Sequence, residues 1–328
     1  MPLFRRTAKG RSTSAAPFAA DETLGIPEVA AAQARAAEGD LDGVAEIHQG
    51  AATIGNAHAV LRLAADTAPL ERVATWRAGR QGDPLAATVH GLALITEAWS
   101  IRGRGQADTV GRSAFQSFWE HLHAAERELE PGTSGWSGAP SAWTGLVLTN
   151  RGLQKSREEL VHLYRQGVAS GGADLLELQE QTLQGLCRKW GGGTDDEMFT
   201  FARSLADPSK PLPANALVCI GHLEAWVAEL DDGKVDSTYL TQRAVVTDVQ
   251  AMAASAWLPG FPSDFSGLGA HNVFAVLLAG VGDLDAAAKH VQHLGPRVRQ
   301  WPWTYLVRQG SLLAELRERA AKAVASQH

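Results

Sequence analysis

Apolar residues recur three and four positions apart over most of this chain, which is the spacing that places them on one face of an α-helix. The alternation of apolar and polar residues that is typical of a half-buried strand is nearly absent. Alanine, leucine, glutamine, glutamate and arginine dominate the periodic stretches, so intrinsic propensity favours helix as well. The pattern predicts an all-α chain of about fourteen helices. Their expected ranges are 29–38, 44–54, 56–65, 69–80, 84–102, 111–129, 156–167, 173–190, 194–206, 214–230, 237–256, 270–280, 284–294 and 303–325.

Turns of glycine followed by aspartate separate several of these helices. They occur at Gly39-Asp40, Gly82-Asp83 and Gly282-Asp283, and two of them open near-copies, GDLDGVAEIHQ from Gly39 and GDLDAAAKHVQ from Gly282. Connections this short make neighbouring helices antiparallel. Stretches 31–47 and 274–291 resemble single tetratricopeptide hairpins, although the full consensus of that repeat is missing. The expected architecture is an array of antiparallel helix pairs, a TPR-like α-solenoid that winds as a right-handed superhelix.

The segment from Leu186 to Arg203 contains a helix end, a glycine turn and a helix start. Thr194 and Glu197 have the spacing of a capping box, as do Ser156 and Glu159. The turn 191–193 also invites a phosphate-loop interpretation, because a glycine loop before a helix can bind an anion. However, a helix precedes this loop and three carboxylates follow it, so helix capping is the favoured interpretation.

Two longer stretches, 130–140 and 257–269, break the helical series with glycines, prolines and aromatic residues. Loops of this kind are more often packed or functional than mobile, so both are candidates for the rim of a groove. Residues 1–25 are expected to form a disordered basic tail, with Arg5, Arg6 and Lys9 and no apolar signal-peptide core. Residues 26–328 are expected to form a single helical-repeat domain with a waist near 130–140, and a division into two domains stays open.

Composition narrows the class of protein. The net charge of −6 is spread over interleaved positive and negative residues, so nucleic acid is not an expected partner. Cys187 and Cys219 lie in apolar helical stretches and are expected to be buried thiols of a cytoplasmic protein. Eighteen apolar residues never occur in succession, so no membrane span is expected. No cofactor is indicated.

One region resembles a known family. Lys189-Trp190-Gly191-Gly192 is followed by a Met-Phe-Thr-Phe-Ala-Arg run that ends at Arg203, and then by His222-Leu223-Glu224-Ala225-Trp226. This series resembles an actinobacterial family described only as domain of unknown function DUF4034. The resemblance extends mainly over 175–230, and it implies a helical-repeat domain with no established activity.

Signatures of common catalytic sites are missing, including the nucleophile elbow and the dinucleotide fingerprint. His290 and His293 are three residues apart on one predicted helix and could share a metal, but no third ligand stands at a recognisable spacing. We therefore expect surface or capping histidines and no metal site. The triplet Glu-Ala-Trp occurs at 97–99 and 224–226, where structural use of the tryptophan is favoured.

The functional hypothesis rests on the number and positions of the tryptophans. Ten tryptophans against three tyrosines is a high proportion, and most are expected in the core. Some of them flank the glycine-proline loops and could line a groove. The leading hypothesis is an intracellular interaction or scaffold protein that binds a peptide or protein partner in a concave groove, with oligomeric state open. Its candidate binding residues are Trp136, Trp143, Lys189, Trp190, Arg203, His222, Glu224, Trp257 and His271.

The alternative is an enzyme or small-molecule-binding protein of unrecognised type. Its pocket would lie near the turn at Trp190, with Arg203, His222, Glu224 and His271 converging from separate helices. Side-chain tips of His222, Glu224 and His271 within about 4 Å of one another would favour this alternative.

Overall fold

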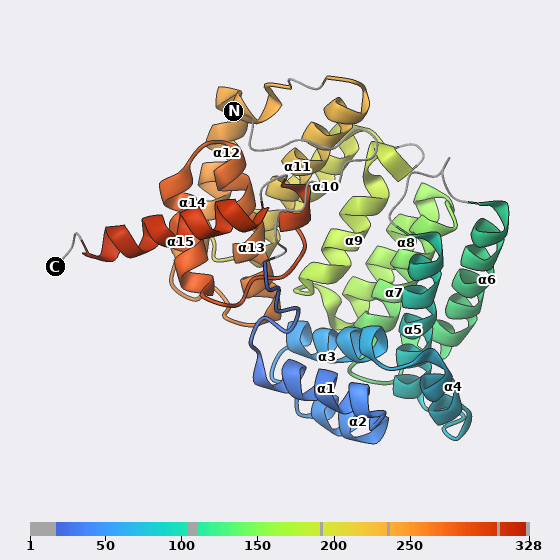
Figure 1. Ribbon diagram of the computed structural model, residues 1–328. Coiled ribbons are helices and arrows are strands. Elements are labelled where there is room, and N and C mark those ends of the chain that lie inside the picture. The colour runs from blue at the N-terminus through green and yellow to red at the C-terminus, as the bar shows by residue number, and fades with distance from the viewer. Residues whose placement is uncertain (1–17, 104–110, 191–192, 235–236, 307–308, 326–328) are drawn as a thin grey trace. The chain divides into compact units, whose positions relative to one another are not determined.

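The computed structural model describes residues 18–103, 111–190, 193–234, 237–306 and 309–325 (Figure 1). These residues form α-helices and short 3₁₀ or π turns with no strand among them, so the all-α prediction is confirmed. The helices are α1 Pro27–Glu38, α2 Leu41–Gln49, α3 Ile54–Thr67, α4 Leu70–Ala78, α5 Pro84–Arg102, α6 Arg112–Leu129, α7 Ala139–Gly152, α8 Arg157–Gly167, α9 Leu176–Leu186, α10 Asp195–Leu205, α11 Ala216–Asp231, α12 Arg243–Ala254, α13 Phe265–Gly280, α14 Leu284–Leu294 and α15 Gln309–Ala325.

The chain divides into two compact units. Unit 1 comprises Met1–Gly25, Cys187–Lys189 and Thr194–His328, and unit 2 comprises Ile26–Leu186 and Trp190–Gly193. The chain therefore passes between the units at 186–194, whereas the region 130–140 lies inside unit 2. Each unit has its own helices, α1 to α9 in unit 2 and α10 to α15 in unit 1.

Unit 2 is built as pairs of helices. The odd-numbered helices follow one another in contact: α1 packs on α3, α3 on α5, α5 on α7 and α7 on α9. The even-numbered helices α2, α4, α6 and α8 each pack on at least one odd-numbered neighbour. At the contact of α5 with α6, a Cβ on Gly91 would stand 2.5 Å from Cγ of Leu129, so glycine allows the close approach of the two helices.

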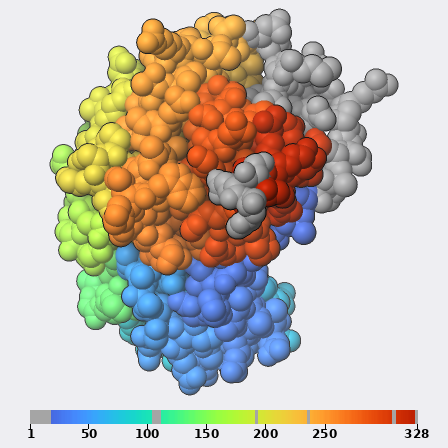
Figure 2. Space-filling model, turned by 90° about the vertical axis from the view of Figure 1, so that its left-hand side faces the viewer, coloured from blue at the N-terminus to red at the C-terminus, as the bar shows by residue number. Residues whose placement is uncertain are grey.

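Unit 1 has its core on α11 and α13. Both helices are apolar on nearly all sides, and α13 contacts α11, α12 and α14. Helix α15 packs on α14, and the surface of these C-terminal helices is coloured orange to red in Figure 2. A helix that is apolar all round must be covered by other helices, which is the role of α10, α12 and α14 here.

The predicted junctions are confirmed at Gly39-Asp40, at Gly282-Asp283 and at the Thr194 capping box, and in part at Ser156. Gly39 and Gly282 both have the left-handed conformation, with φ of 83° and 89°. The side chain of Asp40 accepts a hydrogen bond from the Gly43 amide, and that of Asp283 accepts one from Ala286. Each pair thus ends one helix and caps the next. Thr194 and Glu197 form a complete capping box, while Ser156 caps α8 by accepting from the Glu159 amide. Gly191 and Gly192 lie outside the described residues.

Three features of the sequence prediction need correction. Helix α7 was not expected, because its glycines and threonines are weak helix formers. Its small residues permit close packing of helices, as at Gly145 beside Leu129. Helix α13 begins at Phe265, five residues early, because Asp264 accepts from the Gly267 amide and caps it. The helix expected over 237–256 is reduced to α12 with a 3₁₀ turn on each side.

The end of the predicted basic tail is ordered rather than disordered. Leu24 is fully buried, and the Asp21 amide donates to the Val298 carbonyl over 2.8 Å. Glu22 accepts from the Gln300 amide, so residues 18–25 are part of unit 1. Apolar burial and backbone hydrogen bonds outweigh the entropy of ordering this segment. The basic residues Arg5, Arg6 and Lys9 lie outside the described residues.

The two cysteines are buried, as predicted. Among the helices of the described residues, none has the length and apolar character needed to cross a membrane.

Candidate functional site

Glu224 of α11 is the buried carboxylate of an ion pair in unit 1. Its side chain is only 2% exposed, and its Oε2 lies 2.6 Å from Nζ of Lys189. The hydroxyl of Tyr305 donates to Oε1 over 3.1 Å. Burial, and then the neighbouring carboxylate, raise the pKa of Tyr305 well above its usual range, so the phenol stays protonated and keeps donating. Lys189 and Glu224 are thus brought together, but as partners of each other.

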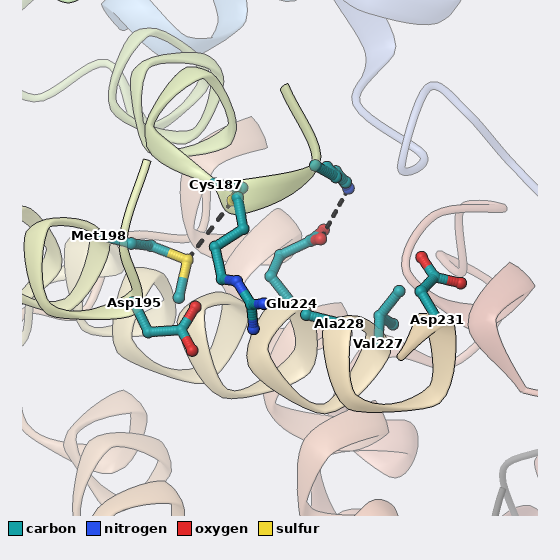
Figure 3. A pocket seen from close by; sticks show the side chains of 9 residues that line it. Cys187, Asp195, Met198, Glu224, Val227, Ala228 and Asp231 are labelled. Atoms are coloured by element: carbon teal, nitrogen blue, oxygen red, sulfur yellow. Dashed lines mark hydrogen bonds and ion pairs between the residues drawn. The ribbon is translucent and has the colours of Figure 1, made fainter. Parts of the chain in front are cut away.

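The cavity beside this ion pair is small. Cys187, Met198, Val227 and Asp231 are among its lining residues, and the Cys187 thiol donates to Sδ of Met198 over 3.4 Å (Figure 3). Its volume of about 10 Å³ is close to the least that holds one water molecule. Sites for small organic ligands are usually larger than about 300 Å³. The space therefore does not accept a metabolite without rearrangement.

His222 lies in a second polar group, which we call the His222 site. Its Nε2 is 3.0 Å from Oδ2 of Asp248, and its Nδ1 is 2.9 Å from the hydroxyl of Tyr239. A carboxylate only accepts, so Nε2 carries the proton and Nδ1 is the acceptor for the Tyr239 hydroxyl. Arg203 donates to the same Asp248 oxygen over 2.8 Å. Asp248, His222 and Tyr239 therefore form a chain in which a carboxylate orients an imidazole base toward a hydroxyl.

The protonation states of this chain follow from burial and hydrogen bonding. Burial lowers the pKa of His222 although Asp248 acts in the opposite direction, so the imidazole is neutral at pH 7. Burial alone would raise the pKa of Asp248, but hydrogen bonds from Arg203 and His222 lower it below its usual value. Burial raises the pKa of Tyr239 to about 12. A neutral base facing a protonated phenol is the arrangement needed for general-base chemistry.

Three histidines of unit 1 form a further group, the imidazole cluster. His271 comes from α13, and His290 and His293 come from α14. Nδ1 of His271 is 2.8 Å from Nδ1 of His290, and the ring of His271 stacks on that of His293 with centroids 4.2 Å apart. A separation of three residues on one helix predicts that His290 and His293 lie on the same face. His271 comes from another helix and joins them only because α13 packs on α14.

The geometry of the imidazole cluster is that of a hydrogen bond rather than a metal site. Two nitrogens bound to one tetrahedral zinc ion stand roughly 3.3 Å apart, given bonds of about 2.0–2.1 Å. The observed 2.8 Å between the Nδ1 atoms fits one ring donating to the other. Within the residues that the structure describes, no group of three metal-ligating side chains is placed to hold an ion.

All three histidines of the imidazole cluster resist protonation. Burial lowers the pKa of His271 to about 3, and it lowers the pKa of His290 well below its usual value. Burial also lowers the pKa of His293, to which the positive charge of Arg297 adds. The cluster is therefore neutral at pH 7 and behaves as a group of aromatic rings.

Trp257 covers the imidazole cluster and remains 48% exposed. Its ring centroid lies 5.3 Å from that of His271, 4.8 Å from His290 and 5.7 Å from His293. The other predicted loop tryptophans have structural roles in unit 2. The Trp136 indole donates to the Gly132 carbonyl, and that of Trp143 donates to Thr133, so both close the loop 130–138.

The residues of the predicted enzyme pocket do not form one group. His222 bonds to Asp248 and Tyr239, Glu224 to Lys189 and Tyr305, and His271 to His290. Arg203 does approach His222, through Asp248. Trp190 packs on Trp99 in unit 2. Asp248 and Tyr239 were missed by sequence reasoning, because they lie on other elements with no fixed spacing from His222.

Comparison with known proteins gives no relatives for this chain. No protein-family model, no curated protein and no solved structure matches it. The resemblance of 175–230 to DUF4034 therefore stays a prediction.

Proposed function

We propose that this chain is a TPR-like helical-repeat protein that binds a segment of a partner protein. The packing inside each unit supports the repeat interpretation, because α1, α3, α5, α7 and α9 contact one another in series, as do α11 and α13. In a repeat array each helix pair packs on the following pair, and the exposed surfaces of the pairs serve binding. The matching Gly-Asp hairpins at Gly39 and Gly282 add to this support.

The single observation that carries the binding proposal is the environment of Trp257. The Trp257 side chain is 48% exposed, which leaves a large apolar surface in water. Contacts with three imidazole rings nevertheless hold it in one orientation. A large aromatic side chain with a fixed orientation loses little entropy on binding, which is why tryptophan is frequent among residues that dominate interface energies. Leu258, Pro259 and Phe261 follow it in the loop; Pro259 is exposed, and Leu258 and Phe261 are half-buried.

The chemistry of the partner follows from the charges near Trp257. Lys289 and Arg297 act on the imidazoles of the cluster, and both are cationic. A partner segment that combines an apolar side chain with neighbouring acidic residues complements this surface. We therefore propose an acidic peptide segment with an apolar anchor as the ligand of Trp257.

The test compares two tryptophans of similar exposure. Trp119 on α6 is 45% exposed and lies in unit 2, so Trp119→Ala is the matched control for Trp257→Ala. A partner captured by the tagged wild-type chain would be purified, and its affinity for both variants measured. We expect Trp257→Ala to weaken binding at least about 30-fold, the effect of a loss of about 2 kcal/mol, and Trp119→Ala to leave it unchanged. Equal affinity for Trp257→Ala and wild type would contradict the proposal.

A second candidate function, catalysis at the His222 site, is favoured by the chain of Asp248, His222 and Tyr239. The His222 imidazole is neutral, accepts from the Tyr239 phenol and donates to the Asp248 carboxylate. In hydrolases, an imidazole base and the carboxylate that orients it are arranged in the same way. Arg203 lies next to this chain with its side chain 55% exposed, where it can attract an anionic substrate.

Turnover of chromogenic esters by wild type, Tyr239→Phe and His222→Gln tests this candidate. Catalysis at the His222 site predicts loss of activity in both variants, about 10²-fold or more for the loss of a general base. Equal rates in wild type and Tyr239→Phe would remove the candidate. Thermal unfolding of each variant separates loss of activity from loss of structure.

A further inference from the structure

Unit 2 contains a compact group of two tryptophans and two arginines, which we call the open cluster. It consists of Trp99 and Arg102 of α5, Arg151 of α7 and Trp190. The two indole rings meet edge to face with centroids 5.7 Å apart. The guanidinium of Arg102 lies 5.5 Å from the ring of Trp99 and 5.8 Å from that of Trp190. That of Arg151 lies 5.5 Å and 5.1 Å from the same two rings.

Every polar group at the ends of these four side chains is a hydrogen-bond donor. Indole and guanidinium nitrogens have no acceptor capacity. The indole N–H groups of Trp99 and Trp190 are both buried, and neither has an acceptor among the residues that the structure describes. A buried donor without an acceptor costs stability, so a pair of them in one group calls for an explanation.

The orientation of Trp99 places its N–H edge at the end of α7. Its Cζ2 atom, on the same edge as the N–H, would stand 3.5 Å from a Cβ on Gly152. Gly152 follows Arg151 directly, and the Arg151 guanidinium donates to Oε1 of Gln181 over 2.8 Å. The edge of Trp99 that carries the N–H thus lies beside the helix end that includes Arg151.

The same unit holds a second combination of arginine and tryptophan that shows what completes such a group. Arg80 lies over the ring of Trp76 at 5.1 Å. The Trp76 indole donates to Oδ1 of Asp42 over 2.6 Å, and Arg80 donates to the same oxygen over 2.5 Å. A carboxylate therefore satisfies both donors in this closed cluster, which consists of Trp76, Arg80 and Asp42.

We propose that the open cluster is a binding site for a small oxyanion, with a carboxylate as the preferred chemistry. The bound oxygen atoms take the place that Asp42 occupies in the closed cluster, accepting from the indole N–H groups and from Arg102. Guanidinium groups bind carboxylates through two parallel hydrogen bonds, which adds strength and orientation. The indole N–H groups are buried, and a hydrogen bond away from water is electrostatically stronger.

The indole signals in a ¹H–¹⁵N NMR spectrum test this directly, because each tryptophan N–H gives its own resonance. The full chain would be titrated with acetate, succinate and inorganic phosphate at matched ionic strength. The variants Trp99→Phe and Trp190→Phe assign the two signals, since each removes one N–H and keeps an aromatic ring. We expect both signals to shift on titration, while that of Trp76, already bonded to Asp42, stays in place.

Variants of the arginines give the quantitative test. Arg102→Gln should raise the dissociation constant of the anion about tenfold or more, the usual effect of losing a charged hydrogen bond. Arg80→Gln, the matched change in the closed cluster, should leave it unchanged. Shifts with phosphate as well as acetate support a general oxyanion site, and shifts with acetate and succinate alone support a carboxylate site. Signals that do not move up to tens of millimolar anion, or equal constants for wild type and Arg102→Gln, would overturn the proposal.

Discussion

The His222 site and the imidazole cluster of unit 1 use the same side chain in opposite ways. His222 is buried against a carboxylate, so its tautomer is fixed and one nitrogen is directed at a hydroxyl. His271 and His290 are buried against each other and against Trp257, with no carboxylate in their hydrogen bond. Burial lowers the pKa in both places. The difference lies in the partner: a carboxylate makes a buried imidazole a directed base, and a second imidazole makes it part of an apolar core.

The largest expected effect is the loss of folding stability in acid, which the imidazole cluster should cause. The folded chain holds the pKa of His271 at about 3 against an ordinary 6.5, so below pH 6.5 the unfolded chain binds more protons and stability falls as pH falls. Each such histidine costs at most about 1.4 kcal/mol per pH unit, which amounts to about 2 kcal/mol between pH 6.5 and 4.5 because the unfolded histidine is half protonated at pH 6.5. Urea unfolding at several pH values measures this.

Replacing His271 and His290 together by Phe removes the titrating pair and should flatten the dependence on pH over this range. His162→Phe serves as the control, because His162 is exposed on α8. An unchanged slope in the double variant would show that other groups, such as His48 and His58 with pKa values of about 4, dominate acid unfolding.

Asp248→Asn tests the role of the carboxylate in the His222 site by removing its charge. His222 then loses a charged hydrogen-bond partner, and we expect a loss of about 1.5–3 kcal/mol at pH 7. The effect should be complete above the ordinary pKa of 3.8 and should decrease as pH falls below it, because the folded chain holds the pKa of Asp248 lower still and the charged bonds are lost only as the carboxyl becomes protonated. Denaturation of wild type and variant at pH 7 and pH 3 measures the loss in free energy of unfolding at each pH. Equal losses at the two pH values would contradict this account.

Tyr239→Phe removes only the hydroxyl that donates to His222. A loss of about 0.5–1.5 kcal/mol is expected, since one neutral hydrogen bond is lost and a buried Nδ1 keeps no donor. Histidine NMR would show whether the tautomer survives: Nε2 should still carry the proton because Asp248 still accepts it. A switch of the proton to Nδ1 would show that Tyr239, rather than Asp248, fixes the imidazole.

His293→Ala should have the smallest effect. Its side chain is exposed and takes part in the cluster through ring stacking on His271, so we expect a loss of about 0.5 kcal/mol or less. A loss above about 2 kcal/mol would mean that the stacked ring, and not the buried pair, holds the cluster together. Thermal unfolding at pH 7 is sufficient for this comparison.

Local chemistry explains why much of the helical structure could be predicted. The bounds of α5 and α14 were predicted correctly, because Asp83 with Pro84 and the Gly282-Asp283 turn encode their starts within a few residues. Helix α7 was not predicted, because Gly145 and Gly152 are weak helix formers whose lack of a side chain lets Leu129 and Leu122 approach closely. The start of α13 was missed where a single Asp264 cap outweighs the Pro and Gly residues around it.

Periodicity and capping act over a few residues, so the fold class, the hairpin turns and the burial of the two cysteines could be predicted from the amino-acid sequence alone. The contacts between polar groups of different helices, in contrast, form only when the helices pack together. Asp248 contacts His222 although 26 residues separate them, and Trp190 contacts Trp99 although helices α6 to α9 lie between them in the sequence. Helix packing sets such distances, and no fixed spacing in the sequence encodes them. For the same reason the predicted set of Trp190, His222, Glu224 and His271 separated into different clusters once the helices were packed.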